Sequence, residues 1–208
     1  MSYEKINKIL DDLDSLYPNA KAGLDFTTPF ELLIATILSA QCTDVRVNKV
    51  TAVLFKEHNT PKTILDLGVD GLAKYIKSCG LYKTKSKNII NTCNVLYHDY
   101  DSKVPHTIDE LMKLPGVGRK TANVVVSNAF GTPAIAVDTH VFRVTNRIGI
   151  VNEKDVLSTE RALMQEIPRD RWSKSHHLFI WHGRNLCKAR NPRCEECILN
   201  DRCKFYNS

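Results

Sequence analysis

The sequence has no run of apolar residues long enough to cross a membrane, and its first ten residues lack the apolar stretch of a secretory signal peptide. Both absences argue against a membrane-bound or secreted protein, and we expect a soluble protein of the cytoplasm. The chain also lacks an internal repeat, a low-complexity tract and a linker rich in Gly, Pro or Ser. Its 208 residues are therefore expected to form one large domain or two smaller ones that pack closely.

The overall composition is that of a globular protein with a basic surface. Hydrophobic residues make up 43% of the chain and charged residues 25%, which is enough apolar material for a buried core. The formal net charge of +6 suggests an anionic partner such as a nucleic acid. An ordinary soluble basic protein explains the same charge equally well, so charge alone leaves the partner open.

Helix start and stop signals recur along nearly the whole chain and predict an all-α fold. Three consecutive valines at 124–126 are compatible with a strand, but they lie between helix caps and no partner strand is evident. The predicted helices lie within residues 3–16, 28–41, 43–54, 70–80, 85–100, 106–114, 119–131, 138–149, 158–167 and 172–186.

Caps and spacing predict further details of these helices. Thr28 with Glu31, and Thr107 with Glu110, match the capping-box pattern at helix starts. The helix within 28–41 is apolar all round and is predicted to be buried. In the helix that follows it, the residues expected to face inward are Val45, Val50, Val53 and Leu54.

Four of the seven cysteines form a cluster near the C-terminus with the spacing C-x6-C-x2-C-x5-C. Four thiolates in so short a loop can surround one metal centre, and a reducing cytoplasm argues against two disulfides. Structural zinc usually takes two C-x2-C pairs, whereas this loop has one, which favours an iron–sulfur cluster and leaves zinc as the alternative. The other cysteines, Cys42, Cys79 and Cys93, are predicted to be small buried apolar residues. The predicted ligands are Cys187, Cys194, Cys197 and Cys203.

Three basic residues, Lys188, Arg190 and Arg193, lie between the first two cysteines of this cluster. A loop fixed by a metal centre would present these cations rigidly to a phosphate backbone. They are equally compatible with ordinary solvated surface charges.

The segment LPGVGRKTAN, residues 114–123, places two glycines between predicted helices. It fails the P-loop pattern, which needs a glycine directly before the lysine and a strand before the loop. Gly116 and Gly118 are expected to allow positive φ and to let the backbone around Val117 approach a ligand closely. The N–H groups of this hairpin and of the next helix start can hold a phosphate without reading a base, which predicts sequence-independent DNA binding.

Lys120 lies in the first turn of the helix that follows the hairpin. The positive end of the helix dipole disfavours an ammonium there, which favours a neutral amine and its use as a nucleophile. A plain phosphate contact by Arg119 and Lys120 together is the alternative. Eighteen residues further on, Asp138 is expected at a helix N-cap, either as an ordinary cap or as an active-site carboxylate that faces a lysine.

These features together resemble the helix-hairpin-helix (HhH-GPD) superfamily of DNA glycosylases. Residues 114–131, followed by AVDTHVFR at 136–143, are similar to its hairpin and Gly/Pro–Asp signature, and the cysteine loop is similar to its [4Fe–4S] loop. LSAQCTD and GLYKTKSKNI, at 38–44 and 80–89, resemble the segments that fill and wedge the DNA helix in the endonuclease III branch. The resemblance runs in order along almost the whole chain and is weakest over 151–171.

The resemblance implies a six-helix barrel domain over residues 22–132 that carries the helix-hairpin-helix motif. It implies a second helical domain, built from 1–21 and 133–208, that carries the [4Fe–4S] cluster, with the substrate cleft between the two domains. The implied partner is double-stranded DNA that contains damaged pyrimidines or abasic sites. We expect a monomer without membrane association, at the nucleoid of a prokaryotic cell.

The resemblance also implies a bifunctional DNA glycosylase and abasic-site lyase. A damaged base flips out of the duplex, Lys120 attacks C1′ of its deoxyribose, and the resulting Schiff base permits a β-elimination that breaks the strand 3′ to the lesion. Asp138 is expected to stabilise positive charge on the sugar or to move protons. Gln41 is expected to fill the gap left by the base, Leu81 to wedge the opposite strand, and His140 to lie near the lesion or its phosphates.

Two positions favour oxidised pyrimidines over adenine as the substrates. Adenine-removing relatives lack a lysine at the place of Lys120, and they need a glutamate in the helix corresponding to 34–41, which contains no acidic residue here. Two other classes of function stay open on the sequence. One is a monofunctional glycosylase of the same fold for mismatched or alkylated bases, and the other is a non-enzymatic DNA-binding module.

Overall fold

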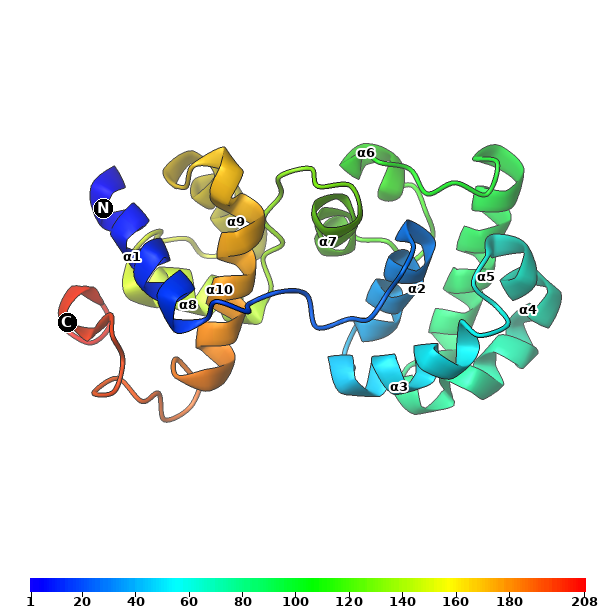
Figure 1. Ribbon diagram of the computed structural model, residues 1–208, viewed down its shortest axis with the longest axis horizontal. Coiled ribbons are helices and arrows are strands. Elements are labelled where there is room, and N and C mark those ends of the chain that lie inside the picture. The colour runs from blue at the N-terminus through cyan, green and yellow to red at the C-terminus, as the bar shows by residue number, and fades with distance from the viewer. The chain divides into compact units, whose positions relative to one another are not determined.

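The computed structural model describes residues 1–208, and its only regular elements are helices, which confirms the all-α prediction (Figure 1). The valines at 124–126 lie inside a helix. No helix has the length and apolar character needed to span a membrane. The helices are α1 (Tyr3–Leu16), α2 (Pro29–Ser39), α3 (Asp44–Leu54), α4 (Pro61–Ile76), α5 (Tyr82–Asp99), α6 (Ile108–Leu111), α7 (Arg119–Ala129), α8 (Thr139–Ile148), α9 (Val156–Glu166) and α10 (Trp172–Asn185), with short 3-10 turns η1 (Lys77–Cys79), η2 (Arg169–Arg171) and η3 (Asn200–Arg202).

The chain divides into two compact units. Unit 1 combines Met1–Lys21 with Pro133–Ser208, and unit 2 is the continuous segment Ala22–Thr132. Unit 1 holds α1 and α8–α10, and unit 2 holds α2–α7. The N-terminal helix therefore shares a unit with the C-terminal third of the chain.

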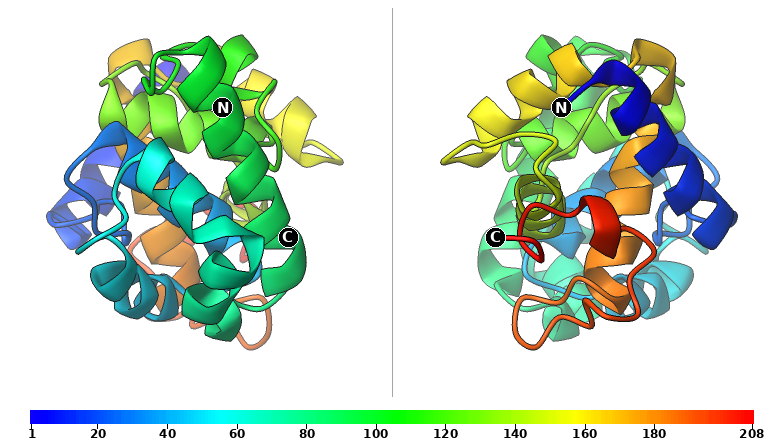
Figure 2. Two further views of the ribbon diagram at one scale, coloured as in Figure 1. Left: turned by 90° about the vertical axis from the view of Figure 1, so that its right-hand side faces the viewer. Right: turned by 90° about the vertical axis from the view of Figure 1, so that its left-hand side faces the viewer.

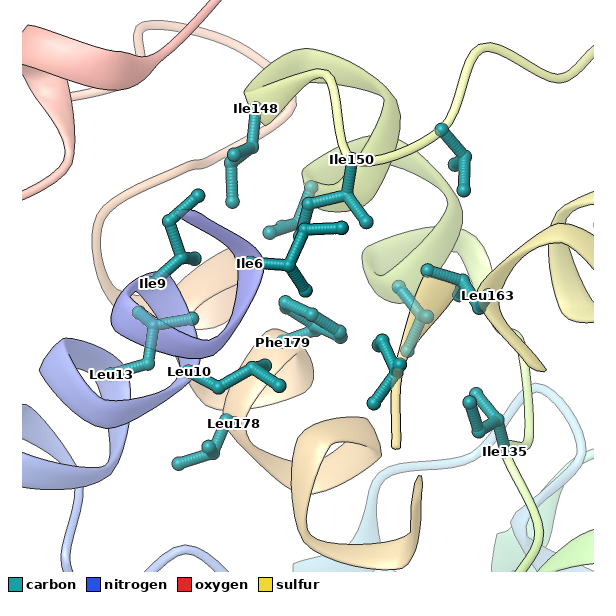
Figure 3. Packing of buried hydrophobic residues seen from close by; sticks show 14 of the residues in the cluster. Ile6, Ile9, Leu10, Leu13, Ile135, Ile148, Ile150, Leu163, Leu178 and Phe179 are labelled. Carbon is teal, nitrogen blue, oxygen red and sulfur yellow. The ribbon is translucent and has the colours of Figure 1, made fainter. Parts of the chain in front are cut away.

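The core of unit 1 explains why α1 belongs to it. The apolar residues of α1 recur at helical spacing, so that one face of the helix is fully buried while the opposite face is polar. Figure 3 shows this face against Leu178 and Phe179 of α10. Burial of each such side chain contributes about 1.5–3 kcal/mol to folding, so this helix is held mainly by its apolar stripe. The buried residues of α1 are Ile6, Ile9, Leu10 and Leu13.

Three carboxylates on the polar face of α1 form ion pairs with basic residues of the C-terminal segment. Asp11 lies 2.8 Å from Arg171, Asp12 lies 2.6 Å from Arg202, and Asp14 lies 2.9 Å from Lys174. Each partly exposed pair is worth only about 0–1 kcal/mol. They fix the orientation of α1 more than they stabilise it.

The core of unit 2 is built around α2, which is buried all round as predicted. It packs against α3, α5 and α7, while α4 and α5 run side by side (Figures 1 and 2). The helix α4 starts at Pro61, well before the predicted region, and Gly68, with a φ of 66°, interrupts it. The predicted caps Thr28 and Thr43 are confirmed, because each side chain accepts a hydrogen bond from the first turn of its helix.

The two predicted capping boxes form only in part. The Thr28 hydroxyl accepts from the Glu31 N–H at 3.1 Å, but the Glu31 carboxylate accepts from the N–H and hydroxyl of Thr27, at 2.6 and 2.7 Å. Thr27 offers two donors, its N–H and its hydroxyl, whereas the backbone of the N-cap residue Thr28 would offer only its N–H. At the start of α6, the Thr107 hydroxyl itself donates to the Glu110 carboxylate at 2.6 Å.

The prediction of the inward face of α3 is wrong for two valines. Val45 and Val53 are 67% and 57% exposed. The buried residues are spaced three or four positions apart and so lie on one face of the helix, and Val45 and Val53 do not lie on that face. The buried residues are Val47, Val50, Thr51 and Leu54.

Candidate functional site

The glycine hairpin of unit 2 joins α6 to α7, and its two glycines have different roles. Gly116 has a φ of +76°, and a Cβ there would lie 2.9 Å from the Cβ of Asn88, so both conformation and space require glycine. Gly118 has a φ of −91°, so the prediction of positive φ is wrong for it. A Cβ at Gly118 would meet nothing within 4 Å, and the backbone is open to an approaching ligand.

The rest of the hairpin is fixed from within unit 2. The Thr92 hydroxyl of α5 donates to the Pro115 carbonyl at 2.7 Å, and the Val117 N–H donates to the Leu114 carbonyl at 3.1 Å. The Val117 side chain is buried. Any contact of Val117 with a ligand would therefore use its backbone.

The first turn of α7 carries the predicted nucleophile. Gly118 is its N-cap and, unlike the threonines that cap α2 and α3, makes no side-chain hydrogen bond to the helix start. Arg119 and Lys120 are the first residues of α7, and Lys120 is exposed. The arrangement presents a primary amine beside a glycine backbone and a helix N-terminus.

In unit 1, Asp138 is the N-cap of α8, as predicted. Its Oδ1 accepts from the N–H groups of His140 and Val141, at 2.8 and 2.9 Å. Its Oδ2 lies 3.4 Å from Nδ1 of His140, and its side chain is 14% exposed. The carboxylate is thus oriented by the helix that it caps, and His140 lies against it.

Two arginines further along α8 hold the backbone around the start of the cysteine loop. Arg143 donates to the carbonyls of Gly183 and Cys187, at 3.0 and 3.1 Å. Arg147 donates to the carbonyls of Lys188 and Ala189, at 2.7 and 3.1 Å. Sequence reasoning did not predict these contacts, although the spacing of the two arginines, one helical turn apart, was a usable signal.

The four cysteines of the loop line one pocket together with apolar side chains of unit 1, which include Ile148, Leu186 and Leu199. Burial raises the pKa of the Cys197 thiol, and the other three cysteines raise it further. Burial and the negative charge of Cys187 and Cys203 likewise raise the pKa of Cys194. This mutual repulsion between thiolates is what a positively charged iron–sulfur core would relieve.

All four sulfur-bearing residues line this one pocket, as a four-cysteine iron–sulfur cluster requires.

A buried histidine lies behind the cysteines. His182 Nε2 is 3.5 Å from the Cys197 sulfur, and its Nδ1 is 3.3 Å from the Tyr17 hydroxyl. Burial lowers the pKa of His182 to about 4, so the imidazole is neutral near pH 7. When Cys197 binds the cluster as a thiolate it can only accept, so Nε2 would then carry the proton and Tyr17 would donate to Nδ1.

The basic residues of the cysteine loop are not equivalent. Arg193 donates to the Asn185 carbonyl at 3.0 Å and pairs with Glu196 at 3.1 Å, so its guanidinium helps to order the loop. Lys188 and Arg190 are exposed. Arg193 is exposed as well, so all three of these cations face solvent.

Gln41 and Leu81 of unit 2 lie in two loops that approach each other. Both have left-handed backbones, with φ of 54° and 46°, and Leu81 is 58% exposed. A Cβ at Gly80 would lie 4.0 Å from the Gln41 carbonyl. Of the scattered cysteines, Cys79 and Cys93 are buried as predicted, whereas Cys42, which follows Gln41, is only half-buried.

Comparison with known proteins matches both parts of the chain. Residues 34–169 match the HhH-GPD superfamily of base excision DNA repair proteins. Residues 187–203 match the iron–sulfur binding domain of endonuclease III, and these limits are the first and last cysteines of the loop. The match confirms the predicted iron–sulfur cofactor, a [4Fe–4S] cluster.

Individual relatives match over nearly their full length. Endonuclease III of Bacillus subtilis (strain 168) is 49% identical over 205 residues, which cover 98% of this chain and 94% of that protein. A solved non-covalent endonuclease III–DNA complex is 48% identical with a TM-score of 0.94, and covers 100% of this chain and 97% of that one. A trapped covalent endonuclease III–DNA intermediate is also 48% identical with a TM-score of 0.94, and covers 100% and 98%. The chain therefore belongs to the endonuclease III family, within the HhH-GPD superfamily of base excision DNA repair proteins.

Proposed function

We propose that Lys120 is the nucleophile of a DNA glycosylase and abasic-site lyase that removes oxidised pyrimidines from double-stranded DNA. The family assigns the chain to base excision repair and to DNA as its partner. The observation that carries the proposal is the exposed Lys120 at an uncapped helix start, directly after a hairpin that the fold holds rigidly. A relative that covers the whole chain has been trapped as a covalent intermediate with DNA, which requires a protein nucleophile.

The proposed reaction begins on the deoxyribose of a flipped base. The neutral amine of Lys120 attacks C1′, the C1′–N glycosidic bond breaks, and the base leaves with the electron pair and takes up a proton. Loss of a proton from the amine and opening of the sugar ring give a Schiff base between Lys120 and C1′. Removal of a C2′ proton then expels the 3′ phosphate by β-elimination, and water releases Lys120.

Asp138 is proposed to supply the negative charge that this reaction needs. The bond to the base weakens before the bond to the amine is complete, so positive charge develops on the sugar. A carboxylate held by two backbone N–H groups stabilises that charge without having to reorganise. His140, which lies against the same carboxylate, is proposed to contact the lesion or its phosphates.

DNA contacts are divided between backbone and side chains. The backbone of Gly116, Val117 and Gly118 is proposed to bind a phosphate, and Gly118 is open to such an approach. Gln41 and Leu81 are proposed to replace the flipped base and to part the opposite strand. In the cysteine loop, Lys188, Arg190 and Arg193 are the proposed phosphate contacts, with Arg193 also ordering the loop.

The two units are proposed to correspond to two domains. Unit 2, which carries the hairpin, would be the six-helix barrel, and unit 1 would be the iron–sulfur domain. When bound, the [4Fe–4S] cluster cross-links the loop through Cys187, Cys194, Cys197 and Cys203 and so orders its cations. We propose that the protein acts as a monomer at the nucleoid, in the cytoplasm of a prokaryotic cell, as its bacterial relative suggests.

Replacement of Lys120 by Ala is expected to abolish covalent trapping on damaged DNA by borohydride, because the reducible Schiff base forms on its amine. The measurement is the fraction of protein linked to a lesion-containing duplex on a denaturing gel. Lys113→Ala, which removes an exposed lysine just before the hairpin, is the matched control and should still trap. A wild-type protein that nicks abasic DNA but never traps would contradict the mechanism.

Asp138→Asn is expected to slow base excision about 100-fold or more, while DNA binding is largely kept. Asn is as good an N-cap as Asp, so this variant removes the charge and keeps α8 capped. Asp138→Ala loses the cap as well and should unfold more easily by about 1 kcal/mol. Single-turnover excision and chemical unfolding measure the two effects, and unchanged excision in Asp138→Asn would leave only the capping role.

A panel of duplexes that differ only in the lesion tests the substrate class. Base release and strand nicking are scored separately for an oxidised pyrimidine, an alkylated base, a mismatched base and an abasic site. We expect release and nicking at oxidised pyrimidines and nicking at the abasic site. Release of mismatched or alkylated bases without nicking would favour a monofunctional glycosylase instead.

The purified protein is expected to be coloured and to contain about four iron atoms per chain, as four cysteine ligands imply. Cys194→Ser should lose iron and visible absorption, because it removes one proposed ligand. Cys42→Ser, outside the cysteine loop, should keep both. Recovery of one zinc ion per chain from a colourless protein would reject the cluster.

A further inference from the structure

The loops that carry Gln41 and Leu81 both hold a non-glycine residue in a left-handed conformation. Such a backbone costs about 1–3 kcal/mol at each residue and persists only where the surroundings impose it. A left-handed backbone is least expected at Leu81, because leucine is bulky and this residue is 58% exposed. Something beneath these loops must hold them in place.

The side chain beneath the loops is Lys85, in the second turn of α5. It is only 5% exposed, and its ammonium donates to the carbonyls of Leu38 and Cys79, at 2.8 and 2.7 Å. Leu38 lies in the last turn of α2, three residues before Gln41, and Cys79 ends η1, two residues before Leu81. One cation therefore ties together the points from which the two loops depart.

The location suits a cation electrostatically. Carbonyl groups at helix C-termini lack partners within the helix and carry the negative end of its dipole, so an ammonium satisfies them. Burial lowers the pKa of Lys85, while the thiols of Cys42 and Cys79 act in the opposite direction. Both bonds go to carbonyls, and no carboxylate forms an ion pair with it.

An ammonium is a costly way to satisfy two carbonyls, because no ion pair offsets the desolvation of its charge. The lysines on either side in the sequence, Lys83 and Lys87, are exposed, so the local sequence is rich in lysine but buries one. The buried ammonium provides directional hydrogen bonds to the carbonyls of Leu38 and Cys79.

We infer that Lys85 is a positioning residue for the opening of DNA: its ammonium holds the loops of Gln41 and Leu81 in the arrangement in which they enter the duplex. The inference rests on the proposed roles of those two residues. Lys85 itself is too deeply buried to contact DNA. Its effect should therefore be confined to steps in which a base pair is broken.

The test compares two substrates that share the chemistry at Lys120. One is a duplex with a single oxidised pyrimidine, which must be opened, and the other is a single strand with an abasic site, which has no opposite strand to part. Lys85→Met, of similar length but without charge, should excise from the duplex about tenfold more slowly or worse, and cleave the single strand within about twofold of wild type. Lys74→Met, an exposed lysine on α4, should behave as wild type on both.

A purely structural role would give a different result. If a folded variant that holds its iron loses both activities equally, or loses neither, the inference is overturned. Far-ultraviolet circular dichroism and iron content check that the variant is intact. If Lys85→Met does not fold, Lys85→Gln, whose amide can still donate to one carbonyl, is judged by the same comparison.

Leu81→Ala and Gln41→Ala separate this inference from the function on which it rests. If neither slows excision from the duplex, the proposed roles of those residues are wrong and the role of Lys85 falls with them. If both slow it and Lys85→Met does not, only the role of Lys85 is wrong. If Lys85 acts through these loops, Lys85→Met should add less than twofold to the loss in a Leu81→Ala, Gln41→Ala background.

Discussion

The bonds from Arg143 and Arg147 to the backbone around the cysteine loop are the interaction on which the chemistry of unit 1 depends. Each guanidinium is planar with fixed donors, so it can hold two carbonyls in a defined geometry. Both arginines belong to the ten-residue helix α8, whose first turn is capped by Asp138. The proposed catalytic carboxylate and the contacts to the iron–sulfur loop therefore belong to the same helix.

The contacts that shape unit 2 involve mainly main-chain groups, whereas those around α8 in unit 1 involve charged side chains. The hairpin offers main-chain N–H groups, Lys85 satisfies main-chain carbonyls, and the left-handed residues Gln41 and Leu81 are set by main-chain conformation. An enzyme that must act at any sequence cannot rely on reading base edges, and backbone contacts to phosphate carry no sequence information. In the proposed mechanism the neighbouring backbone binds the phosphate, and the exposed Lys120 acts as the nucleophile.

Local signals in the sequence were sufficient for much of this structure. The N-cap at Asp138 follows from side-chain chemistry within three residues, and the cysteine loop follows from spacing within seventeen. Predictions failed where a neighbour in space or a competing donor decided the outcome. Glu31 accepts from both the N–H and the hydroxyl of Thr27, and Val45 is exposed because the packing of α3 selects a different face.

The contacts that sequence reasoning missed join distant parts of the chain. Lys85 binds a carbonyl forty-seven residues away, and Arg143 binds one forty-four residues away. The local sequence does not distinguish Lys85 from Lys83 and Lys87, because only the fold determines which of the three lysines is buried. The carbonyl partners themselves become visible only when the tertiary structure is known.

The discontinuous composition of unit 1 has a consequence for biosynthesis. The helix α1 leaves the ribosome before unit 2, yet apart from its own segment every residue in its core cluster lies at position 135 or later. Unit 2 is complete by residue 132 and can fold as soon as it emerges, since domains generally fold as units during synthesis. The apolar stripe of α1 must stay uncovered through that interval, and the cysteine loop is made after unit 2. The nascent chain is therefore exposed to aggregation at α1 until α8–α10 arrive to cover it.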